Sequence, residues 1–183
     1  MSNKLIAIVG MCGAGKSDAT QWFCERGWQK VYFGGVTMEE LKKKGLPVTP
    51  DNEKTERERL LRELGMGAFA ILLSDTIKEK LSVGNVVLDG LYSWSEYKYI
   101  YENISSDIKL VAVIADSGLR YSRLSGRPVR PLTAEQARKR DIAEIENLEK
   151  GGPIAAADHF IDNNGNYEQF RASVEALIDR LEK

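Results

Sequence analysis

Eight consecutive residues near the N-terminus have the types and spacing of a phosphate-binding loop. Residues 10–17 read GMCGAGKS and match the pattern G-x-x-x-x-G-K-[ST]; they follow a predicted strand and open a predicted helix, the context that this pattern requires. Glycines let the backbone turn successive N–H groups toward phosphate oxygens, and the positive end of the following helix adds to the attraction. We therefore expect a nucleotide to be bound by Gly10, Gly13, Ala14, Gly15, Lys16 and Ser17.

Three side chains have the chemistry that a bound nucleoside triphosphate and its metal ion require. Lys16 offers a compact positive charge to the β- and γ-phosphates, and the Ser17 hydroxyl is a ligand for Mg²⁺. Asp89 follows the apolar residues 86–88, so it lies at the carboxyl end of a predicted strand, where ligands collect in open α/β sheets. We expect Asp89 to act on Mg²⁺ through water; a simple turn residue is the structural alternative.

Six arginines surround a proline-containing loop in the C-terminal half of the chain. One guanidinium group can bind two phosphate oxygens at once. A hinged loop suits a lid that closes over a nucleotide. Arg127 and Arg130 lie beside prolines and lack helix partners, so we expect them, with Arg123, to stabilise the phosphoryl group in transfer. The structural alternative is a solvated basic helix face, on which Arg120 and Arg123 would lie. The six residues are Arg120, Arg123, Arg127, Arg130, Arg138 and Arg140.

The order of elements along the chain predicts an α/β domain with the fold of P-loop NTPases. Strands that alternate with helices favour a mainly parallel sheet, here of five strands, flanked by helices. We expect residues 1–183 to form one such domain. Strands are expected at 5–9, 29–33, 85–88, 108–115 and 159–161, and helices at 16–26, 94–101, 133–150 and 167–181, with a further helix capped by Asp116. Thr133 with Gln136 has the pattern of a cap that opens the helix at 133. Residues 37–80 are mostly helical, with breaks at 45, 47, 50 and 65–67.

Composition and charge exclude several classes of protein. The 183 residues include 26 Lys plus Arg and 27 Asp plus Glu, so the formal net charge of -1 lacks the cationic excess of a nucleic-acid binder. No apolar run approaches the ~20 residues that span a bilayer, and we expect no membrane association. Two cysteines without framework spacing suit a reducing compartment, and a single histidine excludes His-based zinc clusters. We therefore expect a cytoplasmic protein, monomeric or homodimeric.

The motifs together resemble those of a family of small kinases. The glycine pattern of the loop, the run Leu88-Asp89-Gly90 and the arginine-rich loop look like those of nucleoside monophosphate kinases and dephospho-CoA kinases. The likeness is closest to adenylate-kinase-related P-loop proteins described as dephospho-CoA-kinase-like. Arg140-Asp141, residues 154–158 and the turn at 163–165 extend it over nearly the whole chain.

This resemblance implies which cofactors the chain binds and which segments contact the acceptor and ATP. Family members bind ATP and Mg²⁺, so both are the expected cofactors. The acceptor would lie over a helical insert, here residues 34–80, and a lid, here 126–140, would close over ATP. Asn163, in the turn at 163–165, would lie near the adenine ring.

The acceptor side departs from the family pattern. Members of this type place an arginine after the second strand and another shortly after the Asp-Gly pair, whereas residues 35–38 and 90–93 of this chain contain none. Arg62, or else Arg57 or Arg59, is our candidate to hold the acceptor phosphate from the insert. We also expect Thr37 and Tyr92 to contact a small phosphorylated acceptor, of the nucleoside monophosphate or dephospho-CoA type.

Three functions remain open at this point. The resemblance favours an ATP-dependent small-molecule kinase, in which Asp89, Asp51 or Glu53 would be the base if the acceptor were a hydroxyl. The second is a nucleotide-dependent switch or regulatory ATPase, although the chain lacks the Asn-Lys-x-Asp run that reads guanine. The third, a metabolite-binding protein without catalysis, is disfavoured by the presence of Lys16, Ser17 and Asp89.

Overall fold

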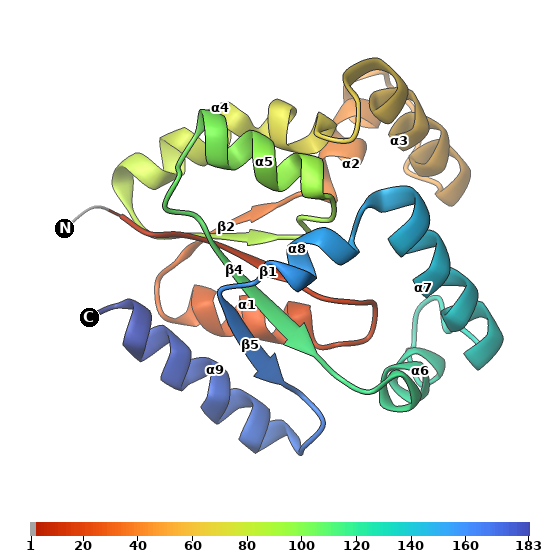
Figure 1. Cartoon of the computed structure of the whole chain (residues 1–183). Coiled ribbons are helices and arrows are strands. Elements are labelled where there is room, and N and C mark those ends of the chain that lie inside the picture. The colour runs from red at the N-terminus through yellow and green to blue at the C-terminus, as the bar shows by residue number, and fades with distance from the viewer. Residues whose placement is uncertain (1–2) are drawn as a thin grey trace.

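A parallel sheet of five strands organises the structure, a computed structural model that describes residues 3–183. The strands are β1 (Leu5–Val9), β2 (Gln29–Tyr32), β3 (Val86–Asp89), β4 (Lys109–Ile114) and β5 (His159–Asp162), in the order β2-β3-β1-β4-β5 (Figure 1). Every pairing is parallel, which confirms the predicted α/β fold class. Residues 1–2 of the expected domain lie outside the described part of the chain.

The register of the middle strands brings the phosphate loop and Asp89 to one edge of the sheet. Ile8 of the central strand β1 is level with Asp89 of β3 and with Val111 of β4. The chain leaves β1 after Val9 and enters the phosphate loop at once. The loop and Asp89 therefore start at the carboxyl edge, where parallel α/β sheets bind ligands.

Side chains that alternate along each strand pack into two apolar layers, one on each face of the sheet. Ile6 and Ile8 point to a layer formed with α1 (Lys16–Glu25) and α9 (Tyr167–Leu181), where Phe23 and Ile178 are fully buried. Leu5, Ala7 and Val9 point to the opposite layer, which is covered by α4 (Ala68–Val83) and α5 (Trp94–Asn103). Because side chains alternate along a strand, an unbroken apolar run such as β1 requires cover on both faces.

Four further helices lie toward the carboxyl edge of the sheet: α2 (Gly35–Lys43) and α3 (Pro50–Leu64) on one side, and α6 (Ser117–Ser125) and α7 (Ala134–Leu148) on the other (Figure 1). The short α8 (Gly151–Ala155) lies over β4 beside α5, and its Ile154 packs against the core on that face. The breaks expected between 37 and 80 fall between α2, α3 and α4. Of the expected insert 34–80, α4 packs on the sheet, and its Phe69 and Ile77 belong to the core.

Helix starts show which local signals were read correctly. The expected cap of α7 is present, because the Gln136 amide donates to Thr133 Oγ1 at 3.2 Å and the Thr133 amide donates to Gln136 Oε1 at 2.9 Å. Asp116, expected to cap α6, occupies the cap position without a side-chain cap bond. Its own amide donates to Asn164 Oδ1 at 2.8 Å instead. Within residues 3–183, no helix is long and apolar enough to cross a membrane.

Candidate functional site

A cavity of about 590 Å³ opens at the carboxyl edge of the sheet, beside the phosphate loop. It is predominantly polar and is bounded by the loop and start of α1, by the ends of β2 and β3, and by α6, α7 and α9. The lining residues are Cys12, Gly13, Gly15, Lys16, Ser17, Asp18, Tyr32, Asp89, Tyr92, Arg123, Arg127, Arg140, Asn163, Tyr167 and Phe170.

The phosphate loop has a backbone that only glycine allows at its ends. Gly10 has φ +141°, and a Cβ there would collide with the carbonyl oxygen of Val113 in β4. Gly15 has φ +105°, and a Cβ there would collide with Asn163 Nδ2. The loop is thus wrapped closely against β4 and the end of β5. These two close contacts explain why the loop pattern has glycine at positions 10 and 15.

Lys16 is folded back over the loop. Its ammonium donates to the Met11 carbonyl at 3.0 Å, while Ser17 is exposed at the start of α1. Burial, together with the nearby Lys150 ammonium, lowers the pKa of Lys16 to about 8. A polyanion bound in the cavity would favour the charged ammonium and reverse both effects.

Asn163 joins the end of β5 to the phosphate loop. Its side-chain Nδ2 donates to the Ala14 carbonyl at 2.8 Å, and Arg123 Nη2 donates to its Oδ1 at 3.2 Å and to its backbone carbonyl at 2.9 Å. Arg123 Nη1 is buried and has no hydrogen-bond partner among residues 3–183. An unsatisfied buried donor is costly, so an acceptor atom from a ligand would be favoured at this nitrogen.

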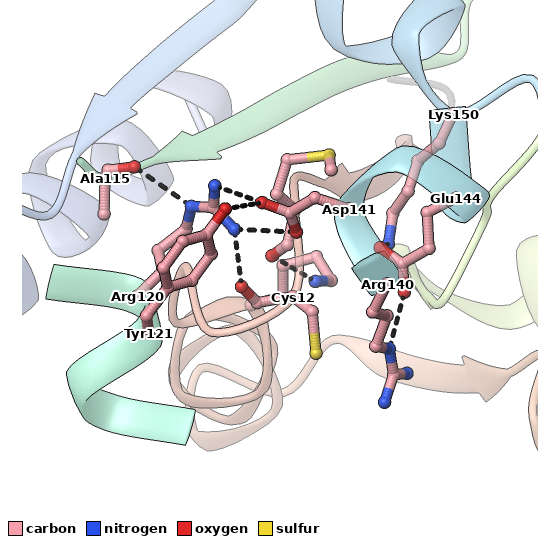
Figure 2. A network of polar contacts seen from close by, with 10 residues as sticks. Cys12, Ala115, Arg120, Tyr121, Arg140, Asp141, Glu144 and Lys150 are labelled. Atoms are coloured by element: carbon pink, nitrogen blue, oxygen red, sulfur yellow. Dashed lines mark hydrogen bonds and ion pairs between the residues drawn. The ribbon is translucent and has the colours of Figure 1, made fainter. Parts of the chain in front are cut away.

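Arg120 ties two helices to the phosphate loop. Its Nη1 and Nη2 donate to the two carboxylate oxygens of Asp141 at 3.0 and 2.7 Å, and Nη1 also donates to the Cys12 carbonyl at 3.0 Å (Figure 2). Tyr121 Oη donates to the same carboxylate at 3.0 Å. A solvated helix face, the alternative weighed for Arg120, is wrong, because Asp141 and the loop carbonyl bury its guanidinium. Only 7% of Arg120 is exposed.

Arg127 and Arg130, the lid arginines expected to stabilise the phosphoryl group, lie in different places. Arg127 lines the cavity, with Nη1 4.0 Å from Cys12 Sγ. Arg130 is exposed and lies 3.8 Å from Glu53 Oε2 of α3, and it is not among the described residues that line the cavity. It has a left-handed backbone, with φ 52°. The predicted phosphoryl-stabilising role of Arg130 therefore requires the loop to move.

Arg140, the last of the six arginines around the proline-containing loop, enters the cavity from α7. Its Nε donates to Glu144 Oε1 at 3.0 Å, and Glu144 Oε2 accepts from Lys150 Nζ at 2.6 Å (Figure 2). Burial acts to raise the pKa of Glu144, but the Lys150 and Arg140 charges outweigh it and hold that pKa below its usual range. The i,i+4 spacing of Arg140 and Glu144 was the signal available in the sequence.

Tyr92, Tyr32 and Asp89 form the opposite part of the wall. Asp89 Oδ2 lies 2.7 Å from Lys30 Nζ, which keeps a cation beside this carboxylate. Burial raises the pKa of the Tyr92 hydroxyl to about 12, and neighbouring Tyr32 adds to the shift. Tyr92 is thus a neutral hydrogen-bonding group over the ordinary range of pH.

The structure does not bring the other acceptor candidates to this cavity. Thr37 is buried in α2, and Arg62 is exposed on α3; neither lines the cavity in the described part of the chain. Arg57 is also exposed on α3. Arg59 is engaged by Glu56, with Nη2 2.6 Å from Oε1. The candidate arginines of segment 34–80 thus lie outside this cavity among the described residues, whereas Arg140 of α7 lines it.

The oxygen ligands at the loop fit a Mg²⁺ ion that also binds water and substrate phosphates, and not a metal ion held by protein ligands alone. Residues 3–183 contain no group of three or more His, Cys, Asp or Glu arranged to hold a metal. Ser17 and Asp89 nevertheless line the same cavity and offer a hydroxyl and a carboxylate. Mg²⁺ commonly binds one or two such ligands, with water and substrate phosphates completing its shell.

Solved structures of kinases share this architecture. A shikimate kinase from Bacteroides thetaiotaomicron matches with a TM-score of 0.61 at 17% identity, over 98% of this chain and 99% of that chain. A gluconokinase from Sinorhizobium meliloti matches with a TM-score of 0.56 at 14% identity, over 98% and 95%. The sheet order, the loop and these likenesses define the fold as that of P-loop kinases.

Sequence relatives define the family. A UPF0200 protein of Pyrococcus abyssi is 33% identical over 183 residues, covering 97% of this chain and 96% of the relative. A second, from Thermococcus kodakarensis, is 34% identical over 181 residues and covers 97% of each chain. The chain belongs to the UPF0200 family. No protein-family profile matches it, and the finer likeness to nucleoside monophosphate or dephospho-CoA kinases is not confirmed by these relatives.

Proposed function

We propose that this protein is an ATP- and Mg²⁺-dependent phosphotransferase that acts on a small phosphorylated acceptor of the nucleoside monophosphate or dephospho-CoA type. One observation carries the proposal: four cationic side chains converge on the cavity at the phosphate loop. They are Lys16, Arg123, Arg127 and Arg140. Phosphoryl transfer requires little covalent chemistry from a protein and depends mainly on positioning and on neutralising the charge that spreads over the phosphoryl oxygens.

Each part of the cavity has a role in this account. The loop amides and Lys16 hold the β- and γ-phosphates, while Ser17 directly and Asp89 through water would hold Mg²⁺. The metal ion, when bound, would neutralise phosphate charge. An acceptor oxygen attacks the γ-phosphorus as the bond to the bridging oxygen of ADP breaks. An acceptor that is already an anionic phosphate brings no proton that must be removed.

We assign acceptor binding to segment 34–80 and the covering role to segment 126–140, with Asn163 beside the nucleotide. Tyr92 is the acceptor contact that the cavity supports best, because its hydroxyl lies in the wall near Asp89. Thr37 and Arg62 would join it only after α2 and α3 move. Since α7 begins at Ala134 and is fixed at Asp141, we expect the moving part of the lid to end before α7.

A second candidate is a nucleotide-dependent switch that transfers phosphate only to water. The observation that favours it is the position of Thr37 and Arg62, which leaves segment 34–80 without a charged contact for an acceptor in this cavity. Such a protein would need a partner, not a second substrate, to stimulate turnover.

Acceptor dependence separates the two candidates. ADP release from Mg-ATP is measured alone and with AMP, CMP, UMP, GMP, their deoxy forms and dephospho-CoA, with Lys16→Ala as the blank. The kinase account predicts that at least one acceptor raises turnover about tenfold or more, the effect of positioning a second reactant. Slow turnover that no acceptor changes would favour the switch.

A further inference from the structure

A buried ion cluster lies behind the α7 wall of the cavity. Glu144 Oε1 accepts from Arg140 Nε at 3.0 Å, and Glu144 Oε2 accepts from Lys150 Nζ at 2.6 Å (Figure 2). Only 5% of Glu144 and 2% of Lys150 are exposed. Glu144 and Lys150 are buried charges, which are tolerated only when they are paired and hydrogen-bonded. The Arg140 side chain is 49% exposed and extends from this pair into the cavity.

The cluster has more positive charge than it can neutralise itself. One carboxylate stands between two cations, which leaves one positive charge in excess. Arg140 uses Nε for Glu144, and its two terminal nitrogens point away from the carboxylate (Figure 2). Arg140 lines the cavity, so this pair of donors presents a fork that suits two oxygens of one anion.

Lys150 does not itself line the cavity. Its Nζ lies 4.8 Å from the centre of the Tyr92 ring, and Tyr92 belongs to the cavity wall. The ammonium thus lies behind that ring, and its hydrogen bond goes to Glu144, the carboxylate that also holds Arg140. By occupying Glu144 Oε2, it leaves a single oxygen for Arg140. Without Lys150, a carboxylate four residues along the helix would attract both edges of the Arg140 guanidinium.

We propose that Lys150 is a positioning residue that acts through Glu144 to keep the Arg140 fork directed at an anionic group, phosphate or carboxylate, of the acceptor. The inference rests on the proposed phosphotransferase function for the identity of that anion. The inference can be tested by binding alone, without a measurement of turnover. Inorganic phosphate, added to protein saturated with Mg-ADP, serves as the probe of the fork.

The test is a double-mutant cycle on Glu144→Gln and Lys150→Met. Phosphate binding is followed by the NMR signal of the Arg140 Nε–H, which is assigned with Arg140→Lys. Lys150→Met should weaken phosphate binding about tenfold or more, because the lone buried carboxylate recaptures Arg140. The double variant, with no such carboxylate, should recover to within about threefold of the unchanged protein.

Lys139→Met is the matched control, because it removes a lysine from the exposed face of α7, the helix that carries Arg140 and Glu144. It should leave phosphate binding and the Arg140 signal unchanged. A Lys150→Met protein that binds phosphate normally, or a double variant that binds no better than Lys150→Met, would overturn the proposal. So would a loss confined to Mg-ADP affinity, because the fork would then serve the nucleotide.

If Lys150→Met does not fold, Glu144→Gln and the double variant carry the test. Once Glu144 is neutral, removing Lys150 should change phosphate affinity by less than about twofold, because no carboxylate is then left for Lys150 to hold away from the Arg140 fork. A further loss above about fivefold would mean that Lys150 acts on the ligand directly, contrary to the proposal. This test is independent of the proposed function. If no acceptor supported turnover, the phosphotransferase function would be contradicted, but the effect of Lys150 on phosphate binding could still be measured.

Discussion

Arg120 and Asp141 form a bidentate ion pair between α6 and α7, with donor–acceptor distances of 3.0 and 2.7 Å. The same Arg120 nitrogen that reaches Asp141 Oδ1 also donates to the Cys12 carbonyl of the phosphate loop. Asp141 is adjacent in sequence to Arg140, a lining residue of the cavity. One buried pair therefore fixes both the loop and the helix that brings Arg140 to it.

Arg120→Met should destabilise the protein strongly. Removing one partner leaves the Asp141 carboxylate buried without its cation, a change that typically costs about 3–5 kcal/mol. Chemical denaturation followed by circular dichroism measures the free energy of unfolding. Arg138→Met, which removes an exposed arginine from α7, the helix that carries Asp141, should change it by less than about 0.5 kcal/mol. Equal effects of the two substitutions would contradict the account.

ATP affinity should depend on the protonation of Lys16. Burial lowers the pKa of this lysine to about 8 in the free protein. Bound phosphates favour the ammonium and raise that pKa, so binding near pH 8 should take up a proton. Affinity should be steady below about pH 8 and fall by up to about tenfold per unit above it. Calorimetry in two buffers of different ionisation enthalpy measures the uptake; Lys16→Met should show none, and proton release would refute the assignment.

Gly10→Ala should damage the phosphate loop far more than another glycine substitution. A Cβ at Gly10 would collide with the Val113 carbonyl, and φ +141° is strained for alanine. We expect a loss above about 2 kcal/mol in the free energy of unfolding, together with loss of ATP binding. Gly118→Ala in α6 is the control, because its Cβ has open space and alanine favours a helix. Similar stability of both variants would count against this geometry.

Asn163→Ala should weaken ATP binding by releasing the loop at Ala14. It removes the 2.8 Å hydrogen bond to the Ala14 carbonyl and one acceptor of Arg123. The combined loss corresponds to about tenfold or more in the dissociation constant for ATP, at about 1 kcal/mol for each bond. Asn164→Ala, in the same turn but exposed, should bind ATP normally. Titration with a fluorescent ATP analogue distinguishes the two, and unchanged binding by Asn163→Ala would argue against the proposed role.

Local signals in the sequence predicted the fold and the phosphate loop well. The loop pattern, the apolar run of β1 and the Thr133 cap each lie within a few residues, and short-range sterics and hydrogen bonds decide them. The strand pattern was sufficient for the class of sheet. The edge of the sheet at which the site lies could also be predicted, because Gly10 follows the carboxyl end of β1 and Asp89 ends β3.

Residues whose role depends on partners far along the chain were not predictable in this way. Lys150 has the appearance of a surface lysine before a short helix, yet Glu144 and Tyr92 bury it. Arg62 had the spacing expected for an acceptor ligand, but α3 turns it to solvent. Such outcomes depend on how α3, α5 and α7 pack, which no local pattern encodes.

The central claim is that this cavity moves the γ-phosphoryl group of ATP to an acceptor and not to water. The most direct measurement incubates the protein with Mg²⁺ and ATP labelled at the γ-phosphate, together with the panel of nucleoside monophosphates and dephospho-CoA, and separates labelled acceptor from labelled inorganic phosphate. The account predicts that the label appears in one acceptor and that Lys16→Ala abolishes this transfer. Label found only in inorganic phosphate, at a rate that no acceptor changes, would contradict it.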